Sequence, residues 1–80
     1  MRLPRDVSGQ NLIRLLHRVG YEVTRRSGSH VRLTRKGETE HHITIPLHKV
    51  LKVGTLDRIL TDVAEHLGVT KEELVQSLWG

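Results

Sequence analysis

Cysteine and phenylalanine are both absent from this sequence of 80 residues. Without cysteine the chain has no disulfide framework, no thiolate nucleophile and no zinc site of the cysteine type, and we expect a cytoplasmic location. Tyr21 and Trp79 are the only two aromatic residues of the kind that stack on bases. They are too few for the aromatic platforms of many RNA-binding sheets, and the core must be built from Leu, Val and Ile.

Long apolar runs are also missing, and none follows the N-terminal Met-Arg-Leu-Pro-Arg. We therefore expect neither a signal peptide nor a membrane-spanning helix. A chain of this length supports a single domain, which we expect to occupy residues 1–80.

Acidic residues are scarce in the first part of the chain. Residues 1–36 contain nine Lys or Arg and two acids, whereas residues 37–80 contain four Lys or Arg and seven acids. Nine of the thirteen cations are arginines, whose planar set of donors suits phosphate groups. This asymmetry favours a surface that binds a polyanion. A basic surface without a binding function is the alternative.

Two long segments carry apolar residues at helical spacing. Ser8 is a suitable N-cap for the first, which runs through "NLIRLLHRV" and is expected to end with Gly20 as its C′ residue. Thr55 is expected to cap the second helix, residues 56–67, and Gly68 to end it.

Between these helices the apolar period changes from about 3.6 residues to about two. The change predicts strands at residues 21–26, 30–35 and 41–46, joined by short turns into an antiparallel meander. Pro46 closes the last strand because it cannot donate a ladder hydrogen bond. The apolar face of the sheet is expected to carry Tyr21, Val23, Val31, Leu33, Ile43 and Ile45.

This element order predicts an α+β fold, in which a three-stranded antiparallel sheet is covered on one face by two helices. The opposite face is expected to stay open and to carry His30, Arg32 and Arg26.

His30 is the candidate catalytic residue. Histidine can exchange protons near neutral pH. The arginines around it in "RRSGSHVRLTR" can hold a phosphodiester and stabilise charge on its oxygens. Gly28 allows the backbone to approach a ligand closely, and Ser29 offers a hydroxyl and an amide. The alternative is an ordinary surface histidine in a hairpin turn.

Two stretches, "NLIRLLHRVGYEVTRRSGSHVRL" and "ITIPLHKVLKVGTLDRIL", resemble the HicA mRNA interferase toxins of bacterial and archaeal toxin–antitoxin systems. The shared features are a helix ending in Gly-Tyr, a strand, Gly-Ser-His, a second strand and a third strand ending in Pro. A loop with lysines then leads to Gly-Thr-Leu and a helix containing Ile-Leu. The resemblance covers roughly residues 9–64.

The resemblance implies a fold like that of double-stranded-RNA-binding domains, α-β-β-β-α, in agreement with the order predicted from the periodicity. It also implies endoribonuclease activity that needs no metal or other cofactor, with the family's histidine at His30 and its turn glycine at Gly28. The partners that it implies are mRNA and a HicB-type antitoxin that covers this surface.

RNA carries its own nucleophile, the 2′-hydroxyl, so a metal-independent ribonuclease mainly needs proton transfer and phosphate stabilisation. We expect His30 to act as general acid or base. The expected RNA contacts are Gly28, Ser29, Arg25, Arg26, Arg32, Lys49 and Lys52. The second proton-transfer group stays open among His17, His41, His42 and His48.

Two further patterns are candidate binding sites. Lys49 and Lys52 flank the N-terminus of the second helix, where backbone amides can bind an anion, and simple capping by Thr55 is the alternative. His41 and His42 are adjacent, but neighbours in a strand point to opposite faces and cannot readily share an ion. We therefore expect no metal site.

Typical members of the family end soon after the second helix, whereas "GVTKEELVQSLWG" continues as an extension over residues 68–80. Thr70 and Glu73 form a capping box for a last helix at residues 71–79. Its leucines are expected to pack against the domain, or against a second copy in a homodimer.

Two other functions fit parts of the sequence. Residues 60–78 also resemble a helix-turn-helix, but its second helix would begin Lys71-Glu72-Glu73 and carry a single cation, which disfavours DNA binding. A non-catalytic module that binds double-stranded RNA would be salt-sensitive and indifferent to His30.

Overall fold

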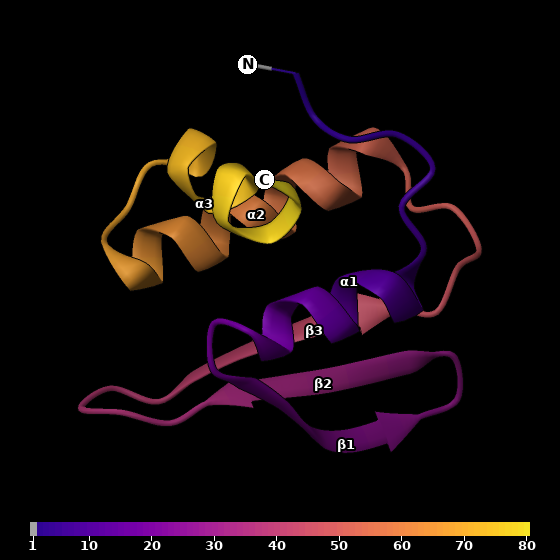
Figure 1. Ribbon diagram of the computed structural model, residues 1–80. Coiled ribbons are helices and arrows are strands. Elements are labelled where there is room, and N and C mark those ends of the chain that lie inside the picture. Colours follow the sequence, from indigo (N-terminus) through magenta and orange to yellow (C-terminus); the bar gives the residue numbers. More distant parts are fainter. Residues whose placement is uncertain (1) are drawn as a thin grey trace.

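The computed structural model describes residues 2–80, which form three strands and three helices. The elements are α1 Gly9–His17, β1 Tyr21–Ser27, β2 His30–Arg35, β3 His41–Pro46, α2 Val53–Leu67 and α3 Lys71–Trp79. The strands form one antiparallel sheet in the order β1-β2-β3. Figure 1 shows α1 lying over one face of this sheet, with α2 and α3 on the same side of it. The predicted α+β fold, with its additional C-terminal helix, is confirmed.

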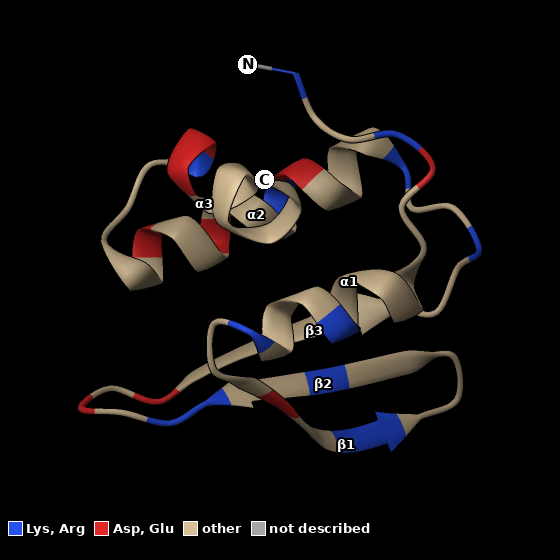
Figure 2. Ribbon diagram, viewed as in Figure 1, with Lys and Arg blue, Asp and Glu red and all other residues tan. Residues whose placement is uncertain are grey.

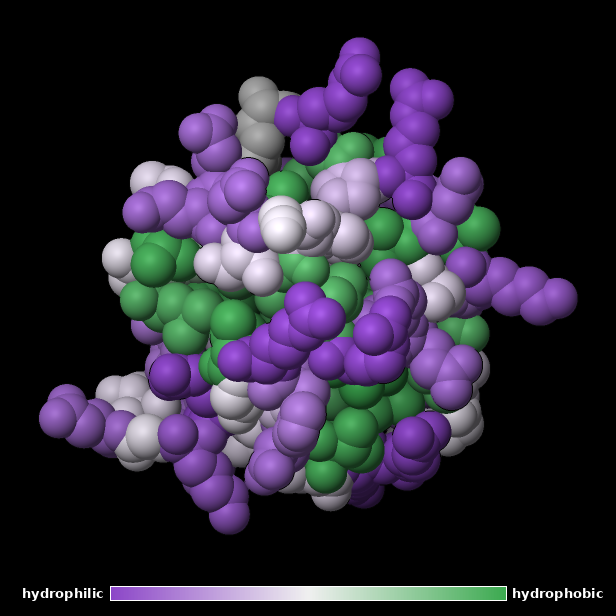
Figure 3. Space-filling view, viewed as in Figure 1, coloured by the Kyte–Doolittle hydropathy of each residue, from purple (hydrophilic) through white to green (hydrophobic). Residues whose placement is uncertain are grey.

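Leu, Val and Ile side chains fill the space between the sheet and the helices. The largest fully buried side chains include Leu12, Leu16, Val31, Leu33, Ile45, Leu56, Ile59, Leu60, Val63, Leu74 and Leu78. The side chains expected on the apolar face are buried except Val23, which is 42% exposed. Hydrophilic side chains project from the surface with hydrophobic patches between them (Figure 3). Within residues 2–80, no helix is long and apolar enough to cross a membrane.

The first helix begins as predicted but ends early. The Ser8 hydroxyl accepts a hydrogen bond from the backbone N–H of Asn11, 3.0 Å away. The helix ends at His17 with Arg18 as its C-cap, so the prediction that Gly20 is the C′ residue is wrong. The N–H groups of residues 18–20 each bond a carbonyl three residues back, which tightens the last turn, and Gly20 (φ +98°) follows it.

The second helix begins earlier than predicted. Its first residue is Val53 and its N-cap is Lys52, whose side chain makes no capping hydrogen bond. Thr55 is therefore inside the first turn and is not the cap, because helical hydrogen bonding already starts between the Leu56 N–H and the Lys52 carbonyl (2.9 Å). Gly68 ends the helix in a left-handed conformation (φ 70°), as predicted.

The capping box of α3 is confirmed in both directions. The Thr70 hydroxyl accepts from the Glu73 N–H at 3.0 Å, and the Glu73 carboxylate accepts from the Thr70 N–H at 2.8 Å. These hydrogen bonds lower the pKa of Glu73 because they favour its charged form. Leu74 and Leu78 of this helix are buried in the same chain, the first of the two expected arrangements.

A β-bulge interrupts β1. The pairing with β2 shifts between Val23 and Arg25, which leaves Thr24 as an additional residue in β1. The Thr24 hydroxyl lies 2.8 Å from that of Thr34 on the neighbouring strand. Thr34 is almost completely buried, and its polar hydroxyl is satisfied there because it also lies 2.8 Å from Nδ1 of His42.

The bulge changes which arginine faces the open side of the sheet. Beyond it, Arg25 lies opposite Arg32 and Arg26 opposite Val31. Since Val31 is buried beneath the helices, Arg26 faces the helix side. The prediction that Arg26 shares the open face with His30 is therefore wrong, and Arg25 takes that position.

The loop after β3 is held against two other segments by backbone hydrogen bonds. The bonds are Leu47 N–H to Ser29 C=O (2.7 Å), Gly9 N–H to His48 C=O (3.0 Å) and Leu51 N–H to Val7 C=O (2.7 Å). They place this loop beside the β1–β2 turn and beside the start of α1.

Candidate functional site

The β1–β2 turn has two residues, Gly28 and Ser29. Gly28 has φ +60° and Ser29 is not among the positive-φ residues, which is the pattern of a type II′ turn with glycine at its first position. A Cβ atom at Gly28 would meet nothing within 4 Å, so the backbone conformation and not the available space requires glycine. The turn pairs Ser27 with His30 and so positions His30 as the first residue of β2.

His30 lines a shallow depression of about 170 Å³ on the open face of the sheet. Its other lining residues are Arg25, Ser27, Arg32 and Thr44. The strand register explains the grouping, because Ser27 lies opposite His30 and Arg32 lies between Arg25 and Thr44 on the two neighbouring strands. All five side chains are exposed.

The sequence predicts three of these lining residues for the site, His30, Arg25 and Arg32, but not Ser27 or Thr44. Thr44 had a usable signal, because it alternates with buried isoleucines on β3 and must point away from the core. For Ser27 the signal was its position next to a two-residue turn, opposite His30.

Positive charge gathers in this depression. Arg25 and Arg32 lie directly opposite each other, an arrangement that destabilises a sheet unless something compensates the charge. Within residues 2–80, neither guanidinium forms a salt bridge. Figure 2 shows cations on β1 and β2, whereas many of the acidic residues lie on α2, α3 and the β2–β3 turn. An anion bound here would relieve the repulsion.

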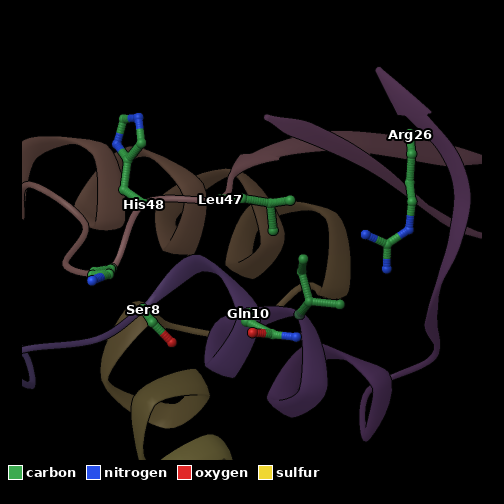
Figure 4. Close-up of a pocket in the computed structure, with 7 residues that line it drawn as sticks. Ser8, Gln10, Arg26, Leu47 and His48 are labelled. Atoms are coloured by element: carbon green, nitrogen blue, oxygen red, sulfur yellow. The ribbon is translucent and has the colours of Figure 1, made fainter. Parts of the chain in front are cut away.

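Two of the predicted RNA contacts, Arg26 and Lys49, lie on the helix side of the sheet. They line a second cavity of about 300 Å³, which we call the helix-side cavity. Its lining residues are Ser8, Gln10, Ile13, Arg26, Leu47, His48 and Lys49. In Figure 4 the guanidinium of Arg26 reaches from β1 toward α1, and His48 lies at the opposite end of the labelled group. The predicted contact Lys52 is elsewhere, at the N-cap of α2.

His42 faces the open side but is remote from His30. Its Nδ1 atom lies 2.8 Å from the Thr34 hydroxyl, and its Nε2 atom lies 3.0 Å from a carboxylate oxygen of Glu40. His42 pairs with Thr34, whereas His30 pairs with Pro46. Four residues along β2 correspond to about 13 Å, too far for both imidazoles to serve one phosphodiester.

His41 points to the other face, as expected for neighbours in a strand, and links the sheet to α2. Its Nδ1 atom lies 2.6 Å from the Tyr21 hydroxyl and its Nε2 atom 3.1 Å from Asp62. Its ring stacks on that of His66 with centroids 4.3 Å apart. Burial raises the pKa of Tyr21 to about 12. Burial and the neighbouring His41 lower the pKa of His66. These contacts give His41 a structural role.

The two remaining candidate histidines also lie away from the depression. Nδ1 of His17 lies 3.3 Å from the carbonyl of Tyr21, at the end of β1 opposite the turn. His48 is near the turn, since the preceding residue bonds Ser29, but it lines the helix-side cavity. Within the described residues no group of three His, Asp or Glu side chains is arranged to hold a metal ion.

The third helix, α3, does not present a cationic surface. Lys71, the single Lys or Arg on α3, donates to the carboxylate of Asp57 on α2. Glu72 and Glu73 add negative charge at the start of α3. This arrangement disfavours binding of a nucleic acid by α3, because such a helix must approach phosphates.

The fold and the site thus define a small α+β protein with a cationic depression on the open face of its sheet. A comparison with known protein families matches residues 9–67, about three quarters of the chain, to the HicA toxin of bacterial toxin–antitoxin systems. The chain therefore belongs to the HicA toxin family, and it is a toxin of a system that also includes an antitoxin. The match extends to the end of α2 and leaves α3 outside. Searches of curated proteins and of solved structures found no match.

Proposed function

We propose that this toxin is an endoribonuclease that cuts mRNA in the cytoplasm, with His30 as its catalytic residue and no metal in the reaction. The observation that carries the proposal is the grouping of His30 with Arg25 and Arg32 in one exposed depression of a HicA-family chain. Histidine supplies proton transfer and the arginines supply charge stabilisation, the two functions that RNA cleavage through its own 2′-hydroxyl needs.

In the proposed reaction the imidazole of His30 removes the proton of the 2′-hydroxyl. The 2′-oxygen attacks the adjacent phosphorus and the bond from phosphorus to the 5′-oxygen breaks. The products are a 2′,3′-cyclic phosphate and a 5′-hydroxyl. Water protonates the leaving oxygen, because the depression is open to solvent and the other histidines lie elsewhere.

Arg25 and Arg32 are proposed to bind the phosphate that reacts. They lie on neighbouring strands and face each other across the depression, so a phosphate between them can accept hydrogen bonds from both. Charge that develops on its oxygens is stabilised by groups already in place. Gly28 and Ser29 contribute by holding the turn that presents His30.

The antitoxin partner is proposed to be of the HicB type and to cover the open face. An acidic surface on the antitoxin would compensate the opposed arginines in place of RNA. Residues 1–80 are proposed to act as one domain, to which α3 adds packing area.

The decisive experiment compares cleavage of a labelled transcript by the parent protein, His30→Ala and His42→Gln, each with and without a chelator. His42→Gln is the matched control, a histidine on the same face that lies about 13 Å from His30 along the strands. We expect His30→Ala to lose cleavage by a factor of about 100 or more, and we expect the parent and His42→Gln to cleave with the chelator present.

A folded His30→Ala protein that cleaves at the parental rate would refute the role of His30. RNA binding without cleavage by the parent would favour the non-catalytic alternative. Circular dichroism and the unfolding midpoint show that each variant is folded.

A further inference from the structure

The helix-side cavity has no part in the chemistry proposed above, yet its composition is that of an anion site. Arg26, His48 and Lys49 line it, and none of its lining residues within residues 2–80 is acidic. These three side chains form no salt bridge within the described residues. Their donors are therefore available to a ligand, and a phosphate is the ligand that such a set suits.

The cavity has an apolar wall as well as a cationic one. Ile13 of α1 and Leu47 of the loop after β3 contribute to the lining. Its volume of about 300 Å³ is at the lower end of the range for small-ligand sites. A single nucleotide fits this chemistry, with its phosphate at Arg26 and its sugar or base at the apolar wall, since Arg26 and His48 lie at opposite ends of the labelled group (Figure 4).

The cavity and the depression that holds His30 are separated only by the end of β1. Arg25 lines the depression and Arg26 lines the cavity, although their Cα atoms are about 3.8 Å apart along the chain. β1 is an edge strand, so its outer edge is free of a neighbouring strand. The loop that carries His48 is also tied to the turn, through Leu47 and Ser29.

We propose that the helix-side cavity is a second RNA subsite, and that a single-stranded RNA crosses the edge of β1 between Arg25 on one side of the sheet and Arg26 on the other. The inference rests on the proposed ribonuclease function and adds the substrate class. A strand that turns around the edge of a sheet must be unpaired there, because only single-stranded RNA can be bent and splayed in this way.

The test measures binding of 2′-O-methyl RNA, which keeps the phosphates but lacks the free nucleophile and is not cut. Fluorescence anisotropy is recorded with a dinucleotide, a longer single strand and the corresponding duplex, over a series of salt concentrations. The variants are Arg25→Gln, Arg26→Gln and Lys49→Gln. The matched controls are Arg18→Gln and Lys36→Gln, which remove exposed cations at the opposite end of the sheet.

For the longer strand, we expect Arg26→Gln and Lys49→Gln each to weaken binding by about tenfold, since each removes a charged hydrogen bond. Each should lower the salt slope by about 0.7 per lost phosphate contact. The dinucleotide is too short to occupy the depression and the cavity at once, so Arg25→Gln, Arg26→Gln and Lys49→Gln should each weaken its binding less than they weaken binding of the longer strand. The duplex should bind more weakly than the single strand. The two control variants should bind like the parent.

Three results would overturn this inference. The first is that Arg26→Gln and Lys49→Gln bind the longer strand as the controls do. The second is that the duplex binds as well as the single strand. The third is that Arg26→Gln weakens binding of the antitoxin but leaves binding of RNA unchanged. A His30-dependent cleavage by the parent together with any of them would leave the proposed function standing. Absence of cleavage by the parent would instead refute the proposed function.

Discussion

Gly9 is the position where the addition of a single methyl group has the most definite consequence. A Cβ atom placed there would lie 2.0 Å from the carbonyl oxygen of Pro46 and 3.2 Å from Cα of Leu47. Real Cβ contacts are essentially never shorter than 3.0 Å, so the start of α1 and the end of β3 must separate by about 1 Å in Gly9→Ala. Both contacts involve backbone, which cannot give way as a flexible side chain can.

The net effect follows from three opposing terms. Forcing extra volume into a packed contact costs about 1–3 kcal/mol. The Gly9 N–H bond to the His48 carbonyl (3.0 Å) lengthens or breaks, which costs about 1 kcal/mol. Replacing glycine by alanine at a permissive position returns about 0.4–1 kcal/mol through the unfolded chain. Gly9→Ala is therefore expected to lower the free energy of unfolding by about 2 kcal/mol.

Gly54 provides the matched control, because it lies in the first turn of α2 as Gly9 lies in the first turn of α1. A Cβ atom at Gly54 would meet nothing within 4 Å, so Gly54→Ala should stabilise by about 0.4–1 kcal/mol. Urea unfolding followed by circular dichroism measures both, and thermal midpoints should fall by about 8–16 °C for Gly9→Ala. A Gly9→Ala protein as stable as the parent would contradict the close approach of α1 to the end of β3.

Two further predictions concern the contacts at the far end of the sheet. Tyr21→Phe keeps the buried ring but removes the hydroxyl that lies 2.6 Å from Nδ1 of His41, and it should lower the free energy of unfolding by about 1 kcal/mol in urea. The parent should also lose stability between pH 10 and pH 12, because the unfolded chain ionises Tyr21 at a lower pH than the folded chain does. Tyr21→Phe should lack this loss. The pKa of His66 is lowered on folding, so as the pH falls below 6.5 the unfolded chain takes up the proton at a higher pH than the folded chain does, and the parent loses stability. His66→Gln should therefore make the free energy of unfolding less dependent on pH in this range. An unchanged unfolding free energy for Tyr21→Phe, or an unchanged acid limb for His66→Gln, would contradict these assignments.

The strands were predictable from the sequence because their apolar residues alternate regularly. Ile43 and Ile45 on β3, and Val31 and Leu33 on β2, identify the buried face without ambiguity. The capping box of α3 was equally predictable, since it depends on two residues three positions apart. His30 and its neighbour Arg32 on the open face followed from the same alternation.

The start of α2 was not predictable from local signals. Thr55 is a good capping residue, but the observed N-cap is Lys52, three residues earlier. The preceding loop is held by Leu51, which is buried and bonds the carbonyl of Val7. That contact joins segments far apart in the sequence, so the local preference for threonine at an N-cap was overridden by tertiary structure.

The faces of the sheet that Arg25 and Arg26 take depend on two requirements that conflict: the register set by the β1–β2 turn and the burial of the apolar face. The two-residue turn pairs Ser27 with His30, and regular pairing from there would place Thr24 opposite Leu33. Burial of Tyr21 requires instead that Tyr21 lie on the same face as Leu33, which places Val23 opposite Leu33. One residue of β1 must therefore bulge out.

For residues between the bulge and the turn, the turn determines which face of the sheet each side chain takes. For residues before the bulge, burial in the core determines it. The bulge at Thr24 satisfies both at the cost of one unpaired residue, and Arg25 and Arg26 lie on the turn side. Alternation counted forward from Tyr21 assigns these two arginines to the wrong faces, whereas counting backward from the turn assigns them correctly. The geometry of the candidate site is thus specified by the turn that presents His30, and a change of one residue in the length of that turn would exchange the two arginines between the depression and the helix-side cavity.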